Sequence, residues 1–249
     1  MTFIDVHCHL DFYGDKKIEE LVERARKKGV EIIVNNAVKP ESIKKVFELA
    51  RKFEEVKAAL GIYPIDALAM EDKAIDEQIE LIRKNKNEIV AIGEVGIDFK
   101  EDSEEHERQK KTFQKFIDLA MELDKPIIVH SRMAEKEVVD ALEASGAKKV
   151  VLHCFSGSLE LEKRAEDNGW YFSIPTNVKY SKQFQALAKE VPLSQILCET
   201  DSPFLHPDKK KDNEPANVIE SYKKIAEIKG ITLEEAEKKI EENYKRLFG

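Results

Sequence analysis

Residues 3–9, Phe3-Ile4-Asp5-Val6-His7-Cys8-His9, are a short apolar run that ends in two histidines. Such a run has the length and composition of a buried β-strand. Because side chains alternate between the two faces of a strand, His7 and His9 should share one face and Cys8 should take the other. The stretch therefore predicts a first strand that brings two imidazoles to the same side of a sheet.

The same kind of run recurs seven more times along the chain. The further apolar runs occupy residues 31–34, 56–60, 89–92, 126–129, 149–152, 170–174 and 195–198. Amphipathic stretches that predict helices lie at 17–28, 40–54, 71–87, 104–123, 134–145, 159–168, 180–190, 214–229 and 232–247. Eight alternating units predict an α/β protein with a single (β/α)8 TIM barrel domain over residues 1–249. An open doubly wound sheet is the alternative architecture.

Helix-ending and helix-starting signals agree with these boundaries. Glycines that can adopt positive φ follow four of the predicted helices, at Gly29, Gly146, Gly169 and Gly230. Thr232 and Glu235 have the spacing of a capping box at the start of the last helix. No Gly/Ser-rich or Pro-rich linker divides the sequence, which favours one domain.

The composition excludes several classes of protein. The formal net charge is −8, whereas proteins that coat long nucleic acid usually have a basic face. The apolar runs are too short to span a membrane, and the first residues lack the pattern of a signal peptide. Three widely spaced cysteines argue against a disulfide framework and favour a reducing, cytoplasmic location. The sequence has no heptad repeat of the kind that would indicate an obligate protein partner.

Polar residues gather at the ends of the apolar runs. Six of the eight runs end in potential metal ligands or other polar groups, namely His7, His9, Asn35, Glu94, Asp98, His130, His153, Glu199 and Asp201. The third and seventh runs offer only Tyr63 and Thr176. In a TIM barrel the carboxyl ends of all strands meet at one face, where active sites lie. One histidine there is usually structural, but four histidines with carboxylates beside them indicate bound metal.

The types of ligand narrow the choice of metal. Imidazole and carboxylate together suit Zn²⁺, Mn²⁺ or similar ions and disfavour a purely soft-metal site. Six candidate ligands, His7, His9, Glu94, His130, His153 and Asp201, exceed the four of one tetrahedral zinc. Two divalent ions that share a carboxylate account for the number, and Glu94, near the middle of the chain, is the predicted bridge.

The three cysteines are predicted to be small buried strand residues and not ligands. Strand alternation places Cys198 on the face opposite to Glu199 and Asp201. The same alternation places Cys154 opposite to His153.

Six motifs follow one another in a fixed order and span almost the whole chain. They are IDVHCH at 4–9, IGEVGID at 92–98, IVHSR at 128–132, LHCFSG at 152–157, ETDSPFL at 199–205 and NEPANV at 213–218. This ordered set resembles the TatD family of metal-dependent deoxyribonucleases, among the amidohydrolase-like barrels. The sequence departs from the family pattern in 173–178, after the seventh run, and at Asp212, which takes the place of a frequent arginine.

The resemblance implies a two-metal hydrolase. One ion would be held by His7, His9, Glu94 and Asp201, and the other by Glu94, His130 and His153. A metal-activated water would attack phosphorus, with Asp201 as ligand and proton acceptor and Glu94 as the second catalytic residue.

Three further features concern the surroundings of this predicted site. Arg132 could bind a phosphate of the substrate through its planar guanidinium, although a surface salt bridge is an equal alternative. Glu199 could hold the imidazole of a ligand histidine in one orientation. The lysines at 209–211 could steer a polyanion, or they could simply be solvated.

The sequence therefore predicts a metal-dependent nuclease that releases nucleotides from single-stranded or damaged DNA ends. The cofactors would be two divalent ions per chain, Zn²⁺, Mn²⁺ or Mg²⁺. One alternative is a metal-dependent deacylase that acts on aminoacyl-tRNA or on another ester or amide. The other is a non-catalytic barrel stabilised by metal, which the surplus of ligands disfavours.

Overall fold

The computed structural model of the protein describes residues 2–249, so residue 1 of the predicted domain lies outside the described residues. The strands are β1 (Phe3–Cys8), β2 (Val30–Asn36), β3 (Val56–Leu60), β4 (Ile89–Asp98), β5 (Ile127–Arg132), β6 (Val150–His153), β7 (Tyr171–Pro175) and β8 (Ile196–Glu199). They form one parallel sheet in sequence order, from β1 to β8. This order confirms the predicted (β/α)8 TIM barrel and excludes a doubly wound sheet, in which the strand order reverses.

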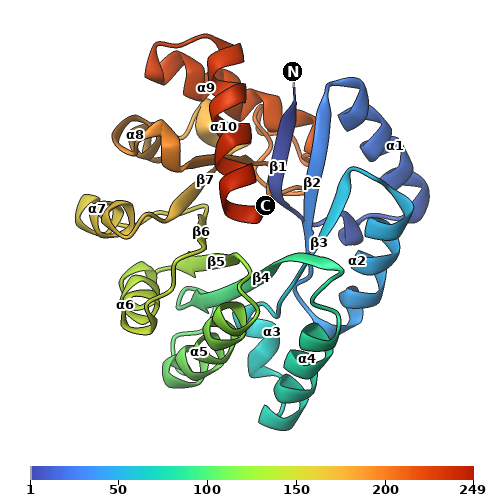
Figure 1. The fold of residues 1–249 in the computed structure, drawn as a ribbon, viewed down its shortest axis with the longest axis vertical. Helices are drawn as coiled ribbons and strands as arrows, with labels where there is room; N and C mark the ends of the chain where they lie inside the picture. Colours follow the sequence, from blue (N-terminus) through green and yellow to red (C-terminus); the bar gives the residue numbers. More distant parts are fainter. Residues whose placement is uncertain (1) are drawn as a thin grey trace.

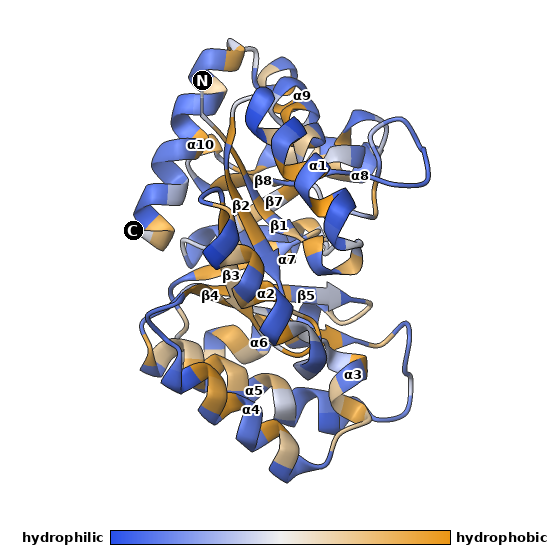
Figure 2. Cartoon of the chain, turned by 90° about the vertical axis from the view of Figure 1, so that its right-hand side faces the viewer, coloured by the Kyte–Doolittle hydropathy of each residue, from blue (hydrophilic) through white to orange (hydrophobic). Residues whose placement is uncertain are grey.

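Helices surround the strands on the outside (Figure 1). The α-helices are α1 (Asp15–Lys27), α2 (Pro40–Lys52), α3 (Pro64–Leu68), α4 (Asp72–Lys84), α5 (His106–Glu122), α6 (Glu135–Ser145), α7 (Leu159–Asp167), α8 (Lys182–Glu190), α9 (Ile219–Lys229) and α10 (Leu233–Phe248). Short 3₁₀ turns are η1 (Leu10–Phe12), η2 (Thr176–Lys179), η3 (Leu193–Gln195) and η4 (Pro215–Val218). Figure 2 shows mostly apolar strands and helices in which polar and apolar residues are mixed, as expected for a parallel barrel covered by amphipathic helices.

The predicted helix boundaries are largely confirmed. All four glycines that follow helices have positive φ, and Thr232 and Glu235 form both hydrogen bonds of the capping box. Two of the helical segments differ from prediction. The five-residue helix α3 was missed because a single turn offers no periodicity to detect. The last part of 214–229 is helix α9, but its first part is the 3₁₀ turn η4.

Strand β4 is longer than predicted and carries the central carboxylate. It extends to Asp98, which pairs with Arg132 of β5, so Glu94 lies within the strand and not at its end. The pairing is irregular between Ile92 and Val95. Gly96 permits the close approach of the two strands, because its φ is 150° and an added Cβ would lie 2.0 Å from the carbonyl oxygen of His130.

The two ends of the sheet are joined by hydrogen bonds between β1 and the residues after β8. The amide of Asp201 donates to the carbonyl of His7 (2.9 Å), and the amide of His9 donates to the carbonyl of Ser202 (2.8 Å). The buried carboxylate of Asp5 accepts from the amide (2.9 Å) and the hydroxyl (2.6 Å) of Thr200. These contacts form the β1–β8 seam, which brings the first and last predicted ligands together.

No helix within residues 2–249 combines the length and the apolar character that crossing a membrane requires.

We expect Asp5→Ala to destabilise the protein by about 2–4 kcal/mol, because it leaves two buried donors of Thr200 without an acceptor. Urea unfolding in a chelator measures this effect apart from bound metal. Asp5→Asn is the matched control, since its side-chain oxygen still accepts from the Thr200 amide and it should cost much less. Equal stability of the alanine variant and the wild type would show that the seam does not depend on this carboxylate.

Candidate metal centre

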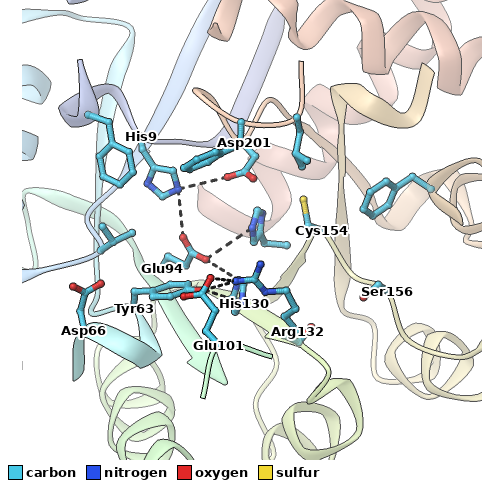
Figure 3. Close-up of a pocket in the computed structure, with 17 residues that line it drawn as sticks. His9, Tyr63, Asp66, Glu94, Glu101, His130, Arg132, Cys154, Ser156 and Asp201 are labelled. Carbon is cyan, nitrogen blue, oxygen red and sulfur yellow. Dashed lines mark hydrogen bonds and ion pairs between the residues drawn. The ribbon is translucent and has the colours of Figure 1, made fainter. Parts of the chain in front are cut away.

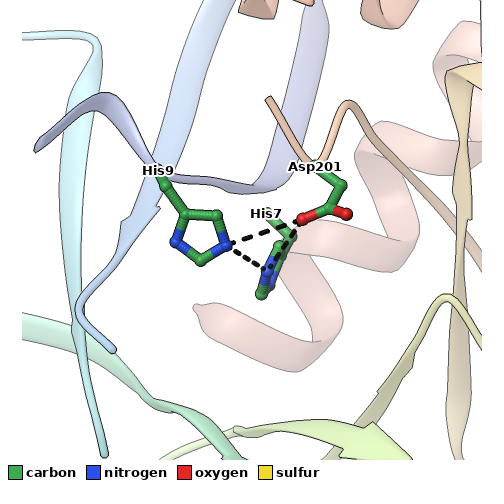
Figure 4. A group of neighbouring side chains, drawn as sticks. All are labelled: His7, His9 and Asp201. Atoms are coloured by element: carbon green, nitrogen blue, oxygen red, sulfur yellow. Dashed lines mark hydrogen bonds and ion pairs between the residues drawn. The ribbon is translucent and has the colours of Figure 1, made fainter. Parts of the chain in front are cut away.

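Two groups of potential ligands meet at the carboxyl end of the barrel. His7, His9 and Asp201 come from the two sides of the β1–β8 seam, and their ligand atoms all lie within 4.8 Å of one another. Figure 4 shows the two imidazoles and the carboxylate turned toward a common point. The second group consists of Glu94, His130 and His153, from β4, β5 and β6, again within 4.8 Å.

Glu94 lies between these two groups and directs one oxygen to each. Its Oε2 is 3.3 Å from Nε2 of His7 and 3.4 Å from Nε2 of His9. Its Oε1 is 3.0 Å from Nδ1 of His130 and 3.9 Å from Nε2 of His153. Figure 3 shows Glu94 between His9 and Asp201 on one side and His130 on the other. This is the arrangement of a carboxylate shared by two cation sites.

The outer nitrogens of two imidazoles have fixed partners. Nδ1 of His9 lies 3.0 Å from the carbonyl oxygen of Asn36. Nδ1 of His153 lies 2.9 Å from Oε2 of Glu199, which also accepts from the hydroxyl of Ser173 (2.5 Å). In each of these two rings, Nδ1 contacts a polar partner outside the centre, and Nε2 faces the centre. Glu199 thus contacts a histidine of the second group, and its predicted role in orienting a ligand imidazole stays a prediction.

Burial and close charges shift the pKa values of these groups. Burial would raise the pKa of Glu94, but hydrogen bonds with His130 and His7 hold it well below its usual range. Burial would lower the pKa of His9, yet its contacts with Asp201 and Glu94 raise it to about 9. His153 follows the same pattern: burial opposes the charged form, but Glu199 raises the pKa to about 10. Carboxylates so strongly favoured in the ionised form require positive charge beside them.

The donor set fits divalent cations. Nε2 of His7 and Nε2 of His9 are only 3.3 Å apart in a buried site, and two carboxylates face them. Among the described residues that line the cavity, Arg132 is the only lysine or arginine, and it lies at the rim. The buried centre therefore has acceptors in excess of protein cations. Imidazole nitrogen and carboxylate oxygen are ligands of Zn²⁺ and Mn²⁺ in particular.

Arg132 belongs to a polar network at the edge of the centre. Its Nε donates to Oδ2 of Asp98 (2.8 Å), and one terminal nitrogen donates to the hydroxyl of Tyr63 (3.1 Å) and to Glu101. The Tyr63 hydroxyl donates to the same Asp98 oxygen (2.6 Å), which also lies 3.1 Å from Nε2 of His130. Asp98 thus connects the guanidinium to a proposed ligand. Sequence had offered Tyr63 and Asp98 only as strand-end polar residues, without this connection.

The prediction that Cys154 is a buried strand residue facing away from His153 was wrong, whereas Cys8 and Cys198 are buried as expected. Cys154 lies one residue beyond β6, has φ of 45°, and lines the same cavity as His153. Its thiol donates to Oε1 of Glu199 (2.9 Å). The left-handed backbone breaks the strand alternation on which the prediction rested.

Other predicted residues lie outside the centre. Oδ1 of Asn35 accepts from the amide of Leu10 (2.7 Å), and the hydroxyl of Thr176 donates to the carbonyl of Leu205 (2.7 Å), so both fix loops. None of the lysines 209–211 lines the cavity, and Lys209 lies over the ring of Tyr180. The cavity itself measures about 560 Å³ and includes Phe12 and Phe204 at its mouth, two residues that sequence analysis did not single out.

A family model described as TatD related DNase matches residues 4–249. The protein belongs to the TatD family. Human deoxyribonuclease TATDN3 is 36% identical to it, in an alignment that covers 98% of this chain and 94% of the relative. An uncharacterized metal-dependent hydrolase of Methanocaldococcus jannaschii, MJ1582, is 38% identical and covers 100% of this chain and 97% of its own. The crystal structure of YJJV, a TatD homologue from Escherichia coli K12, has a TM-score of 0.93 at 27% identity, covering 99% of this chain and 97% of that one.

Membership of the TatD family confirms the predicted family and the predicted enzyme class, a metal-dependent hydrolase. The alternative of a non-catalytic barrel is set aside.

The raised pKa values predict that metal binding releases protons. His9 (pKa about 9) and His153 (pKa about 10) hold protons in the metal-free TatD protein at pH 7.5, and a cation must displace them. Metal affinity should therefore rise with pH from about 6 to 9. Calorimetric titration of Zn²⁺ or Mn²⁺ in buffers of different ionisation enthalpy should show that protons are released as metal binds.

Glu199→Gln is the matched control for this measurement, because it removes the charge beside His153 and preserves the side-chain shape. It should reduce the number of protons released. An enthalpy that does not depend on the buffer, in both proteins, would contradict the assignment of charged imidazoles.

Proposed function

We propose that this TatD protein is a nuclease that hydrolyses phosphodiester bonds at single-stranded or damaged DNA ends with two divalent cations. The observation that carries the proposal is Glu94, whose two oxygens face two separate groups of ligands. One cation would be held by His7, His9, Glu94 and Asp201, and the other by Glu94, His130 and His153. When bound, the pair would supply a water of lowered pKa and neutralise charge on the phosphoryl oxygens.

Asp201 is the residue we assign as proton acceptor. Its carboxylate lines the cavity, with Oδ1 3.5 Å from Nε2 of His9. Burial opposes ionisation, but the hydrogen bond with His9 and nearby imidazoles keep the pKa of Asp201 below its usual value. An ionised carboxylate at the rim of the ligand group can accept the proton of an attacking water.

Arg132 is the residue we assign to the substrate phosphate. Its guanidinium lines the cavity and is held by Asp98 and Tyr63, so its planar fork is oriented before substrate arrives. The side chain remains about two-fifths exposed, which leaves donors free for a phosphate. Glu199 would keep Nε2 of His153 directed at the cation through the contact with Nδ1.

The charge and shape of the protein favour strand ends over long duplex. The net charge is −8, so no general field would hold a polyanion. The proposed centre lies in a cavity of about 560 Å³, which has room for a few groups of a strand end.

The name of the human relative, deoxyribonuclease, supports DNA as the substrate. Three free cysteines suit a reducing location, and we place the protein in the cytoplasm.

The direct test is cleavage of a 5′-labelled single-stranded DNA oligonucleotide by chelator-treated protein to which Mg²⁺, Mn²⁺ or Zn²⁺ is added back. We expect metal-restored cleavage, which Asp201→Asn should reduce by at least about 10³-fold because it loses the proton acceptor and a ligand charge. Asp208→Asn is the matched control, since Asp208 lies in the same loop but pairs with Lys179 at the surface.

The alternative chemistry is tested in the same series. Ester and aminoacyl-tRNA substrates are offered to the same metal-loaded protein. Hydrolysis of these without cleavage of DNA under any metal would replace the nuclease proposal with a deacylase.

A further inference from the structure

Two exposed phenylalanines stand at the mouth of the cavity. Within residues 2–249, seven large apolar side chains are exposed, and of these only Phe12 (46% exposed) and Phe204 (52% exposed) line it. Exposed aromatic surface is unfavourable in water, so two such rings beside one site point to a ligand that covers them.

Each ring is attached to a turn that carries a proposed ligand. Phe12 follows His9 by three residues, and its amide donates to the carbonyl of His9 (3.2 Å). Phe204 follows Asp201 by three residues, and its amide donates to the carbonyl of Asp201 (2.8 Å). The next loop fixes the second turn, because the amide of Asn213 donates to the carbonyl of Pro203 (2.9 Å). The backbone hydrogen bonds therefore fix the position of each ring relative to the proposed ligands.

The rings are arranged around His9. Phe12 stacks on the imidazole, with ring centroids 5.0 Å apart and planes at 20°. Phe204 lies edge-on to Phe12, with centroids 6.2 Å apart and planes at 87°, and 6.5 Å from His9. The two phenylalanines thus form a corner with about half of each side chain exposed, which we call the aromatic corner.

Building on the proposed nuclease function, we propose that the aromatic corner is a stacking subsite for one unpaired nucleobase next to the phosphate that is cleaved. Nucleobases have flat, uncharged faces that stack on aromatic side chains irrespective of sequence. Arg132 lies in another part of the same cavity, away from His9 and Asp201 (Figure 3). A terminal nucleotide that stacks on the corner can therefore extend its phosphate over the centre toward this guanidinium.

This subsite explains how an acidic protein can select strand ends. A base inside a duplex has both faces covered by its neighbours, whereas a terminal unpaired base has a face available. Stacking on Phe204 and Phe12 supplies affinity that does not depend on net charge. The corner is therefore a specificity determinant for unpaired ends and takes no part in the bond-breaking step.

The test compares two labelled single-stranded oligonucleotides of one length, of which one has natural terminal nucleotides and the other has abasic tetrahydrofuran residues at the same end. Wild-type protein should cleave the base-bearing strand with a kcat/KM on the order of tenfold higher. Phe204→Ala should lose this preference because its kcat/KM falls on the base-bearing strand and stays unchanged on the abasic strand. Phe204→Trp should retain the preference. Met121→Ala, which removes an exposed apolar side chain that does not line the cavity, is the matched control and should behave as wild type.

Phe12→Ala is the second variant, and calorimetric metal titration accompanies it because Phe12 also contacts His9. Loss of the preference with unchanged metal affinity supports the subsite. Equal cleavage of both strands by wild type, or an equal loss on both strands in Phe204→Ala, would overturn the subsite and leave the nuclease proposal standing. Cleavage of neither strand by metal-loaded wild type would overturn both.

Discussion

The β1–β8 seam brings together the residues of the first ligand group. His7 and His9 stand at one end of the sequence and Asp201 near the other, and only closure of the barrel brings them together. The backbone hydrogen bonds across the seam involve the ligand-bearing residues themselves, since Asp201 donates to His7 and His9 donates to Ser202. The contacts that close the barrel therefore also set the geometry of these ligands. The side chain of Asp5 stabilises the seam by accepting hydrogen bonds from Thr200.

Glu94, on strand β4, faces the seam residues from across the centre. Strand β4 places this carboxylate so that Oε2 faces the seam residues and Oε1 faces His130 and His153. A buried cluster of acceptors is unfavourable without positive charge, and among the described residues that line the cavity the only lysine or arginine is Arg132, at the rim. Two cations would resolve this imbalance. In the metal-free protein the protons on His9 and His153 take that role, which couples metal binding to pH.

Much of this arrangement could be predicted from sequence, because it follows from periodicity and from the rule that strand ends meet. The eight strands, the end-of-helix glycines and the shared face of His7 and His9 needed no tertiary information. The family is confirmed as well. The roles of the six predicted ligands stay predictions, although the structure brings all six together. Local backbone choices could not be foreseen: φ of 45° turns Cys154 into the cavity, and the short helix α3 follows Tyr63. The bonds that join Tyr63, Asp98 and Arg132 likewise depend on three-dimensional neighbours.

Whether Glu94 is shared by two cations can be measured by anomalous diffraction at the manganese edge from crystals grown with Mn²⁺. We expect two peaks, one contacted by His7, His9 and Asp201 and the other by His130 and His153, with a Glu94 oxygen on each. A single peak, or a second peak held by His153, Cys154 and Asp201 without Glu94, would contradict it.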